Sequence, residues 1–313
     1  MQRLVFLYFV SNLKKMKIIL TGSLGPISKP LVINLIDKGH NVTVISRNTD
    51  KKAEIEQLGA TAAIGSIDSI NFLITTFTGA DAVYLMEPTV DMFDPNIDFL
   101  KHYEKICEKY ALAVINSGVE KIVHLSSIGG HSDEGTGMLA FHYYAEQALK
   151  KLPESVAITT LRPMSFYSNL LAFIPSIKQQ NAIITSYYAN EPEPWASPLD
   201  IAEAAAEELC AVYNGRKVRY IISDEVSSDK LLAVLGKAIG QEIKWVTISH
   251  ETLEEAFKSM GFSPQAASGF VQLNEAKMTG TLYQDLIKHK EEITFGKQKI
   301  EDFAKEFATA FSN

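Results

Sequence analysis

The residues with the clearest chemical potential form a glycine-rich segment near the start of the chain, Thr21-Gly22-Ser23-Leu24-Gly25-Pro26-Ile27-Ser28. Gly22 permits a tight turn, and Gly25 lets the backbone approach a pyrophosphate. A helix that starts directly afterwards would offer unpaired amides and a partial positive charge to that anion. Ser28 takes the place of the usual third glycine, which mainly serves close helix-to-strand packing. The segment therefore predicts dinucleotide binding, and a turn that only reverses the chain is the alternative.

The residues after the second expected strand indicate which dinucleotide would bind. Segment 45–48 reads Ile-Ser-Arg-Asn, at the place where a dinucleotide-binding sheet faces the adenosine ribose. An acid there would bind the 2′-hydroxyl, whereas Arg47 suits a 2′-phosphate and can stack on adenine. Lys51 and Lys52 add positive potential. We therefore expect NADP(H) to be preferred over NAD(H), with Arg47 and Asn48 at the cofactor; a solvated surface arginine is the alternative.

Alternating strands and helices must position these residues. Apolar and β-branched runs predict strands at residues 17–20, 41–46, 60–64, 82–86, 121–125 and 157–161. Helical or connecting segments are expected between them, at residues 27–38, 51–58, 67–78, 95–117 and 138–151. A glycine stands just before four of these strands, at positions 39, 59, 79 and 118. This alternation predicts an α/β fold, a Rossmann-type doubly wound parallel sheet with right-handed crossovers.

The second half of the chain is less regular. Strands are expected at residues 183–185, 219–222 and 244–248, and helices at 200–213, 228–239 and the C-terminal end. The sequence contains no internal repeat and no segment with the composition of a flexible linker. We therefore expect a Rossmann domain at 16–160 and a smaller α/β substrate lobe at 161–313 that interleaves with it.

Composition excludes several classes of protein. The 313 residues are 46% hydrophobic and carry a net charge of −7, which gives no general attraction for nucleic acid or anionic membranes. Two cysteines, Cys107 and Cys210, form no disulfide framework, so we expect a cytoplasmic protein in which both pack as small apolar residues. The apolar run in residues 1–15 is too short to span a membrane. We expect natural translation to start at Met16, or the run to form a short helix that docks on the body.

Taken together, these motifs resemble the NmrA-like branch of the atypical short-chain dehydrogenases, and within it the NAD(P)H:quinone oxidoreductase type. The similarity runs from about Met16 to the C-terminus. Beyond the glycine turn and Arg47, it is carried by Leu125-Ser126-Ser127, His142 with Glu146, Leu161-Arg162-Pro163 with Asn169, and Trp195-Ala196-Ser197-Pro198 with Asp200. The resemblance implies a cofactor over residues 22–27, Arg47, Met86, Ser126 and the loop after Pro163.

The strand ends indicate the remaining walls of the site. Ligands in such folds bind beyond the carboxyl ends of the strands, which places Glu87-Pro88, residues 129–138 and Met164 to Tyr167 around the nicotinamide. Asp68 could accept a hydrogen bond from adenine or cap a helix. A flat aromatic surface for a planar acceptor is expected from Phe166, Tyr167, Tyr187, Tyr188 and Trp195, with ordinary packing as the alternative for each. Asp200 is expected to cap its helix, with contact to the substrate as the alternative.

The usual proton relay of short-chain dehydrogenases, a tyrosine with a lysine four residues later, is missing. Tyr143 is followed at that spacing by Gln147. A quinone or flavin can take its proton from water, so catalysis does not require the pair. His142 or Tyr143 could still donate a proton, although His142 fits the role of a cofactor-pocket or packing residue better. Ser126 could orient a carbonyl group or cap the sheet edge.

Two functions follow from this pattern. The first is an NADP(H)-dependent oxidoreductase that acts on a small planar acceptor such as a quinone. The second, motivated by the missing relay, is a non-catalytic redox sensor that binds NAD(P) and signals to a protein partner. A homodimer is compatible with either. The seven histidines show no close metal-ligand spacing, so no metal site is expected.

Overall fold

A seven-stranded parallel sheet forms the centre of the N-terminal half. The computed structural model describes residues 14–189, 191–293 and 295–313, so the expectations for residues 1–13 lie outside the described residues. The sheet order is β10-β6-β5-β4-β1-β2-β3, and every pairing is parallel. Its strands are β1 (Lys17–Leu20), β2 (Asn41–Ser46), β3 (Thr61–Ile64), β4 (Ala82–Leu85), β5 (Lys121–Leu125), β6 (Ala157–Pro163) and β10 (Arg216–Ile221). This order confirms the predicted Rossmann-type doubly wound sheet.

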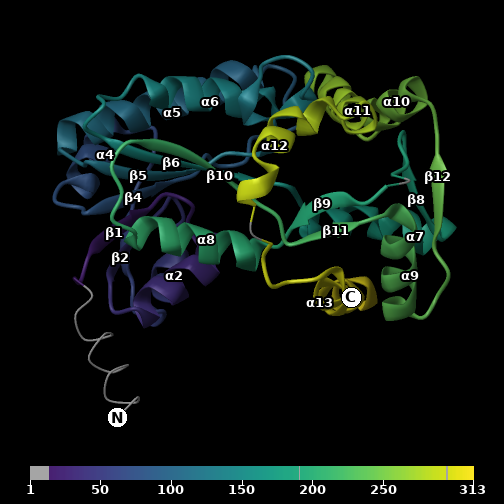
Figure 1. The fold of residues 1–313 in the computed structure, drawn as a ribbon, viewed down its shortest axis with the longest axis horizontal. Coiled ribbons are helices and arrows are strands. Elements are labelled where there is room, and N and C mark those ends of the chain that lie inside the picture. Colours follow the sequence, from purple (N-terminus) through teal and green to yellow (C-terminus); the bar gives the residue numbers. More distant parts are fainter. Residues whose placement is uncertain (1–13, 190, 294) are drawn as a thin grey trace, which may run out of the picture.

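Helices cover both faces of the sheet (Figure 1). One face carries α2 (Ser28–Asp37), α3 (Lys51–Gln57) and α8 (Pro198–Cys210), and the other carries α4 (Ile70–Phe77), α5 (Phe99–Ser117) and α6 (Ala140–Lys150). Each layer encloses its own hydrophobic core, because strands buried on both faces must be apolar on both. The contribution of α8 to the first layer means that the second half of the chain completes the N-terminal fold.

The C-terminal lobe is built on two small sheets. Its strands are β7 (Ser165–Phe166), β8 (Ala182–Thr185), β9 (Glu193–Ala196), β11 (Asp224–Val226) and β12 (Lys244–Thr247), paired as β11-β9-β7 and β12-β8. Its helices are α7 (Ile174–Gln180), α9 (Ser228–Ile239), α10 (His250–Ser259), α11 (Pro264–Met278), α12 (Gln284–Lys288) and α13 (Ile300–Ser312). Short 3-10 helices are η1 (Ile128–His131), η2 (Gly137–Leu139), η3 (Tyr167–Phe173), η4 (Thr281–Tyr283) and η5 (Lys290–Glu292). The expected boundary after residue 160 falls inside β6, and β10 returns to the large sheet.

Polar caps explain where several helices begin. Asp98 accepts from the Lys101 amide, so the helix expected from about Pro95 starts instead at Phe99. Ser69 caps α4, and Ser197 caps α8. The expectation that Asp200 caps its helix is therefore wrong. Asp200 lies in the first turn of α8, where it accepts hydrogen bonds from Ser223 and from the backbone of residues 297 and 298.

A buried arginine ties the C-terminal lobe to the sheet. Arg162 in β6 contacts both carboxylate oxygens of Glu146 in α6, at 2.9 and 2.7 Å. Its remaining nitrogen, Nη1, donates to Asp285 of α12 at 2.8 Å and to Tyr220 of β10 at 3.0 Å. One guanidinium thus joins three elements that are far apart in the sequence.

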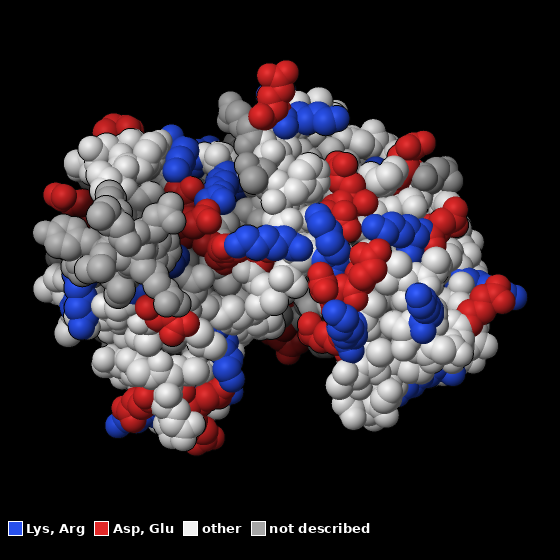
Figure 2. All heavy atoms as spheres, turned by 60° about the horizontal axis from the view of Figure 1, so that its bottom comes forward, with Lys and Arg blue, Asp and Glu red and all other residues white. Residues whose placement is uncertain are grey.

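The surface shows no single-sign region on the face drawn in Figure 2, where basic and acidic side chains are interspersed. Among the described residues, no helix has both the length and the apolar character that crossing a bilayer requires.

Candidate functional site

The glycine turn lies between β1 and α2, as expected. A Cβ atom at Gly22 would lie 2.3 Å from Ser28 Oγ and 3.0 Å from the Met86 side chain. Gly22 is therefore required by close packing, and Ser28 occupies the tight helix-to-strand position, with no exposed surface. Thr21 Oγ1 donates to the Met86 carbonyl at 3.0 Å and accepts from its amide at 2.8 Å, which joins the ends of β1 and β4.

The start of α2 offers its amides without a side-chain cap. The cap residue Ile27 makes no side-chain hydrogen bond, and the first turn holds no acidic residue. A Cβ at Gly25 would find only the Gly22 carbonyl oxygen, at 3.7 Å, so the space in front of this turn is open. Ser23 adopts φ 50°, and its hydroxyl donates to Ser46 at the end of β2 at 3.1 Å. An anion could approach these amides and meet the positive end of the helix.

A cavity of 360 Å³ opens beside this turn, at the carboxyl ends of the central strands. Nine residues that the sequence places at the site line it: Gly25, Ile27, Met86, Glu87, Ser126, His142, Met164, Ser165 and Phe166. Asn169 and Pro198 also line it, so segments of both halves form its walls. Five other residues expected at the cofactor do not line it: Thr21, Gly22, Ser23, Leu24 and Pro163. A site at this edge of the sheet agrees with the switch point between β1 and β4, where the strand order reverses.

Most of the expected aromatic surface lies elsewhere. Phe166 alone of the five predicted aromatics lines the cavity. Tyr167 and Trp195 stack at 6.0 Å within a separate core of the C-terminal lobe, and Tyr187 and Tyr188 pack edge-on against Trp245. The structure instead supplies Tyr103 and Phe141, stacked at 3.9 Å, as cavity aromatics. The sequence pattern does not distinguish aromatic residues that line a cavity from aromatic residues of the core, because both kinds follow helical or strand spacing.

The expected adenosine end is more exposed. Arg47 and Asn48 lie at the surface, just after β2. Within the described residues Arg47 forms no hydrogen bond or ion pair, and its charge helps to lower the pKa of the Asp68 carboxyl. Its exposed guanidinium can still take an anion. Lys51 pairs with Glu54 at 2.8 Å and Lys52 lies 4.0 Å from Glu56, so acidic residues of α3 offset part of the positive potential that the two lysines add. Asp68 does not cap α4; it pairs with Lys109 at 2.5 Å, and that contact lowers the pKa of its carboxyl.

Ser126 faces a buried carboxylate. Its hydroxyl donates to Glu146 Oε1 at 2.6 Å, so its donor proton is engaged, and the side chain is 2% exposed. The expectation of a sheet-edge cap is wrong, because Glu146 takes this hydrogen bond. Ser126 lines the cavity and its oxygen can still accept a hydrogen bond.

The two expected proton donors on α6 face different directions. His142 lines the cavity, whereas Tyr143 does not and contacts Tyr144 edge-on. Successive helical residues point about 100° apart, which places Tyr143 away from the cavity. Burial is the main reason that the pKa of His142 is lowered, to about 3. The ring is therefore neutral near pH 7, and the structure does not support His142 or Tyr143 as the proton donor.

The lowered pKa of His142 predicts a loss of stability in acid. Because the unfolded chain has the ordinary value, it binds this proton first as the pH falls below about 6.5. The free energy of unfolding should then fall with pH down to about 3. Urea denaturation at pH 7 and pH 5 should show wild type losing about 2 kcal/mol more than His142→Leu. Equal losses would show that His142 titrates normally.

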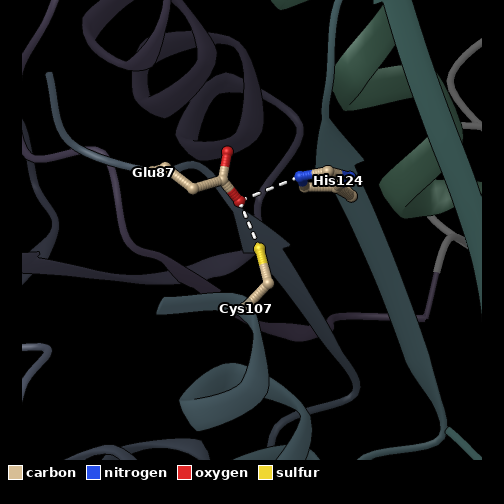
Figure 3. A group of neighbouring side chains, drawn as sticks. All are labelled: Glu87, Cys107 and His124. Carbon is tan, nitrogen blue, oxygen red and sulfur yellow. Dashed lines mark hydrogen bonds and ion pairs between the residues drawn. The ribbon is translucent and has the colours of Figure 1, made fainter. Parts of the chain in front are cut away.

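A buried group beside the cavity combines Glu87, which the strand-end pattern places at the site, with two partners that the sequence analysis did not identify. Glu87 follows β4, Cys107 belongs to α5 and His124 to β5, and all three are buried (Figure 3). Glu87 Oε1 accepts from His124 Nε2 at 2.9 Å and from Cys107 Sγ at 2.8 Å. Glu87 also lines the cavity. The one signal in the sequence was an acidic residue directly after an apolar strand; the partners come from distant segments.

Comparisons with known proteins agree with this architecture. The model of the NmrA-like family matches residues 14–303. A protein of Streptomyces griseus named (4-alkanoyl-5-oxo-2,5-dihydrofuran-3-yl)methyl phosphate reductase is 23% identical over 94% of this chain and 99% of its own length.

Two solved structures share the fold. An NADPH-dependent quinone oxidoreductase from Escherichia coli, solved with NADPH, has a TM-score of 0.75 at 20% identity and covers 92% of this chain and 99% of its own. A triphenylmethane reductase from Citrobacter, solved with NADP(H), has a TM-score of 0.74 at 17% identity and covers 93% and 99%. The family match spans nearly the whole chain and confirms the resemblance carried by its motifs. This protein belongs to the NmrA-like family.

Proposed function

We propose that this protein is an NADP(H)-dependent reductase of a small planar acceptor such as a quinone. The observation that carries the proposal is the cavity that joins the uncapped start of α2 to the carboxyl ends of β4, β5 and β6. One end of it offers amides to a diphosphate. The other end has apolar and aromatic walls, including Tyr103, Phe141 and Phe166. This combination suits a dinucleotide with a flat second ligand against its nicotinamide.

The residues present fit a nicotinamide dinucleotide. Ser28 Oγ is buried at the turn without a hydrogen-bond partner among the described residues, and the place in front of Gly25 is open. The diphosphate would bind at the amides that follow Gly25, and Arg47 would hold a 2′-phosphate. Met86, Ser126, Met164 and the segment that follows Pro163 would hold the nicotinamide, which supplies a hydride when bound. The names of the two solved relatives, which bind NADPH or NADP(H), support the same assignment.

Titration calorimetry with NADPH, NADP⁺, NADH and NAD⁺ tests cofactor binding, and NADPH consumption with a panel of quinones tests turnover. We expect binding of NADPH and loss of its absorbance with at least one quinone. Binding without turnover on any acceptor would favour a redox sensor that signals to a protein partner. No binding of any of the four nucleotides would remove both functions.

Arg47→Ala should separate the two nicotinamide cofactors. A charge-assisted hydrogen bond contributes about 1.5–3 kcal/mol, so NADPH affinity should fall roughly 10- to 100-fold. NADH lacks the 2′-phosphate and should bind nearly as before. Calorimetry on both cofactors measures the difference, and Lys52→Ala, a nearby exposed cation paired with Glu56, is a matched control. An equal loss for NADPH and NADH would refute the role of Arg47.

A further inference from the structure

We infer that Glu87 is the residue that protonates the reduced acceptor, with a proton that it shares with His124. The inference rests on the proposed reductase function and adds the source of the proton. Neither expected donor on α6 supplies it, since Tyr143 lies outside the cavity and the His142 ring is neutral near pH 7, which makes its one N–H too weak an acid. Glu87 would then be a catalytic residue, and His124 and Cys107 would position it.

The geometry connects a buried imidazole to the cavity through one carboxyl group. Glu87 is 7% exposed and lines the cavity directly after β4. Its Oε1 accepts from both His124 and Cys107, whereas its other oxygen points away from both partners (Figure 3). Within the described residues, that second oxygen accepts no hydrogen bond. His124 Nδ1 has no partner among them either, so the proton of this ring can move only toward Glu87.

The pair carries one proton near neutral pH. Burial raises the pKa of the Glu87 carboxyl, but the charge and hydrogen bond of His124 outweigh it and the pKa is lowered. Burial lowers the pKa of His124, but the charge and hydrogen bond of Glu87 outweigh it and the pKa is raised. The favoured state is therefore a carboxylate beside an imidazolium, which is neutral overall and can sit in a buried site.

The other titratable groups around Glu87 do not compete for this proton. Burial raises the pKa of the tyrosines and of the thiol, and lowers that of His142, so all of them are neutral near pH 7. They are Tyr84 of β4, Tyr103, Cys107 and Tyr110 of α5, and His142 of α6. Glu146 and Arg162 act on His124 with opposite signs and are paired with each other. The proton of the His124–Glu87 pair is thus the one available at this end of the cavity.

The step balances with one hydride and one proton. A quinone that gains a hydride becomes a hydroquinone mono-anion. The proton of His124 passes to the Glu87 carboxyl, and the new O–H bond forms between that proton and the phenolate oxygen. The pair is left with one negative charge, which a proton from water neutralises after the product leaves. The sum is reduced nicotinamide, quinone and one proton in, and oxidised nicotinamide and hydroquinone out.

Glu87→Gln tests the step because glutamine keeps the shape and removes the acid. We expect kcat with a quinone to fall about 100-fold, within the usual range for loss of a general acid. Calorimetric NADPH affinity should stay unchanged. Glu208→Gln is the matched control: Glu208 is also buried, but it pairs with Lys217 and Arg219 at the sheet edge, away from the cavity. That control should keep wild-type turnover.

A second acceptor separates proton donation from binding. N-methylacridinium is a planar cation that becomes a neutral product on taking a hydride alone, so it needs no proton. Glu87→Gln should reduce it almost as fast as wild type does. Misfolding of part of the sample would lower both rates equally and leave their ratio unchanged. If the two rates fall together, or if neither falls, Glu87 is not the proton donor.

Two further readouts do not depend on turnover. NMR titration should show the His124 ring protonated above pH 6.5 in wild type and neutral near pH 7 in Glu87→Gln, which has lost its counter-ion. An unchanged titration would overturn the shared proton. The same three residues also hold potential metal-ligand atoms within 4.8 Å of one another. Stoichiometric zinc in the purified protein, absent from Cys107→Ser, would replace this inference with a metal site. If wild type binds no nicotinamide nucleotide, the proposed function fails, whatever these readouts give.

Discussion

Gly25→Ala is expected to weaken NADPH binding by about 2 kcal/mol, roughly 30-fold, while leaving the melting temperature unchanged. The added methyl group meets no atom of the protein closer than 3.7 Å, so the fold has room for it. It would occupy the space through which a diphosphate reaches the amides at the start of α2. Calorimetry and thermal denaturation measure the two quantities independently.

Gly22→Ala, in contrast to Gly25→Ala, is expected to lower the stability of the fold. There a Cβ would lie 2.3 Å from the buried Ser28 Oγ and 3.0 Å from the Met86 side chain, so these tightly packed side chains must shift. We expect a loss of stability of about 1–3 kcal/mol, seen as a lower melting temperature. Wild-type NADPH affinity in a well-folded Gly25→Ala protein would show that the diphosphate does not lie against this turn.

Arg162→Met should lower the free energy of unfolding by about 3–5 kcal/mol. The side chains of Arg162 and Glu146 are 6% and 2% exposed, so removing the guanidinium leaves a buried carboxylate without its counter-ion. The contacts with Tyr220 and Asp285 are lost as well, which loosens the C-terminal lobe from the sheet. Urea denaturation measures the change directly.

The double variant Arg162→Met, Glu146→Gln should recover part of that loss, since no unpaired charge remains buried. Lys258→Ala is a surface control: its ion pair with Glu254 at helical i,i+4 spacing should contribute only about 0.3–0.5 kcal/mol. A cost for Arg162→Met as small as that of the control would show that the buried network does not hold the two halves together.

The features that depend on local sequence patterns, namely the strands of the large sheet and the glycine turn, could be predicted from the sequence. Apolar runs bounded by glycines located the strands of the large sheet, and the turn from Thr21 to Ser28 lies where its spacing placed it. The start of α5 was misplaced by a few residues because Asp98 caps the helix after an extended segment. Asp200 was read as a cap because it is acidic near a helix start, but Ser197 fills that role.

The contacts at the site join segments that are far apart in the chain. Local sequence patterns do not show which distant residues meet in the fold. Glu87 follows β4 and His124 belongs to the neighbouring strand β5, and Cys107 contacts Glu87 from α5, the helix between those strands in the sequence. Nothing in their spacing marks them as partners, since a buried cysteine and histidine are ordinary core residues. The prediction of the aromatic cavity residues is wrong for a related reason. Tyr103 lines the cavity and Trp195 does not, and only tertiary packing decides this.

A crystal structure of the protein soaked in concentrated NADPH tests the central claim most directly. The account predicts the diphosphate against the backbone amides at residues 25–28, the 2′-phosphate beside Arg47, and the nicotinamide between Ser126 and Met164, facing Glu87. A nucleotide bound elsewhere, or side chains of the protein filling that crevice in the presence of the nucleotide, would contradict it.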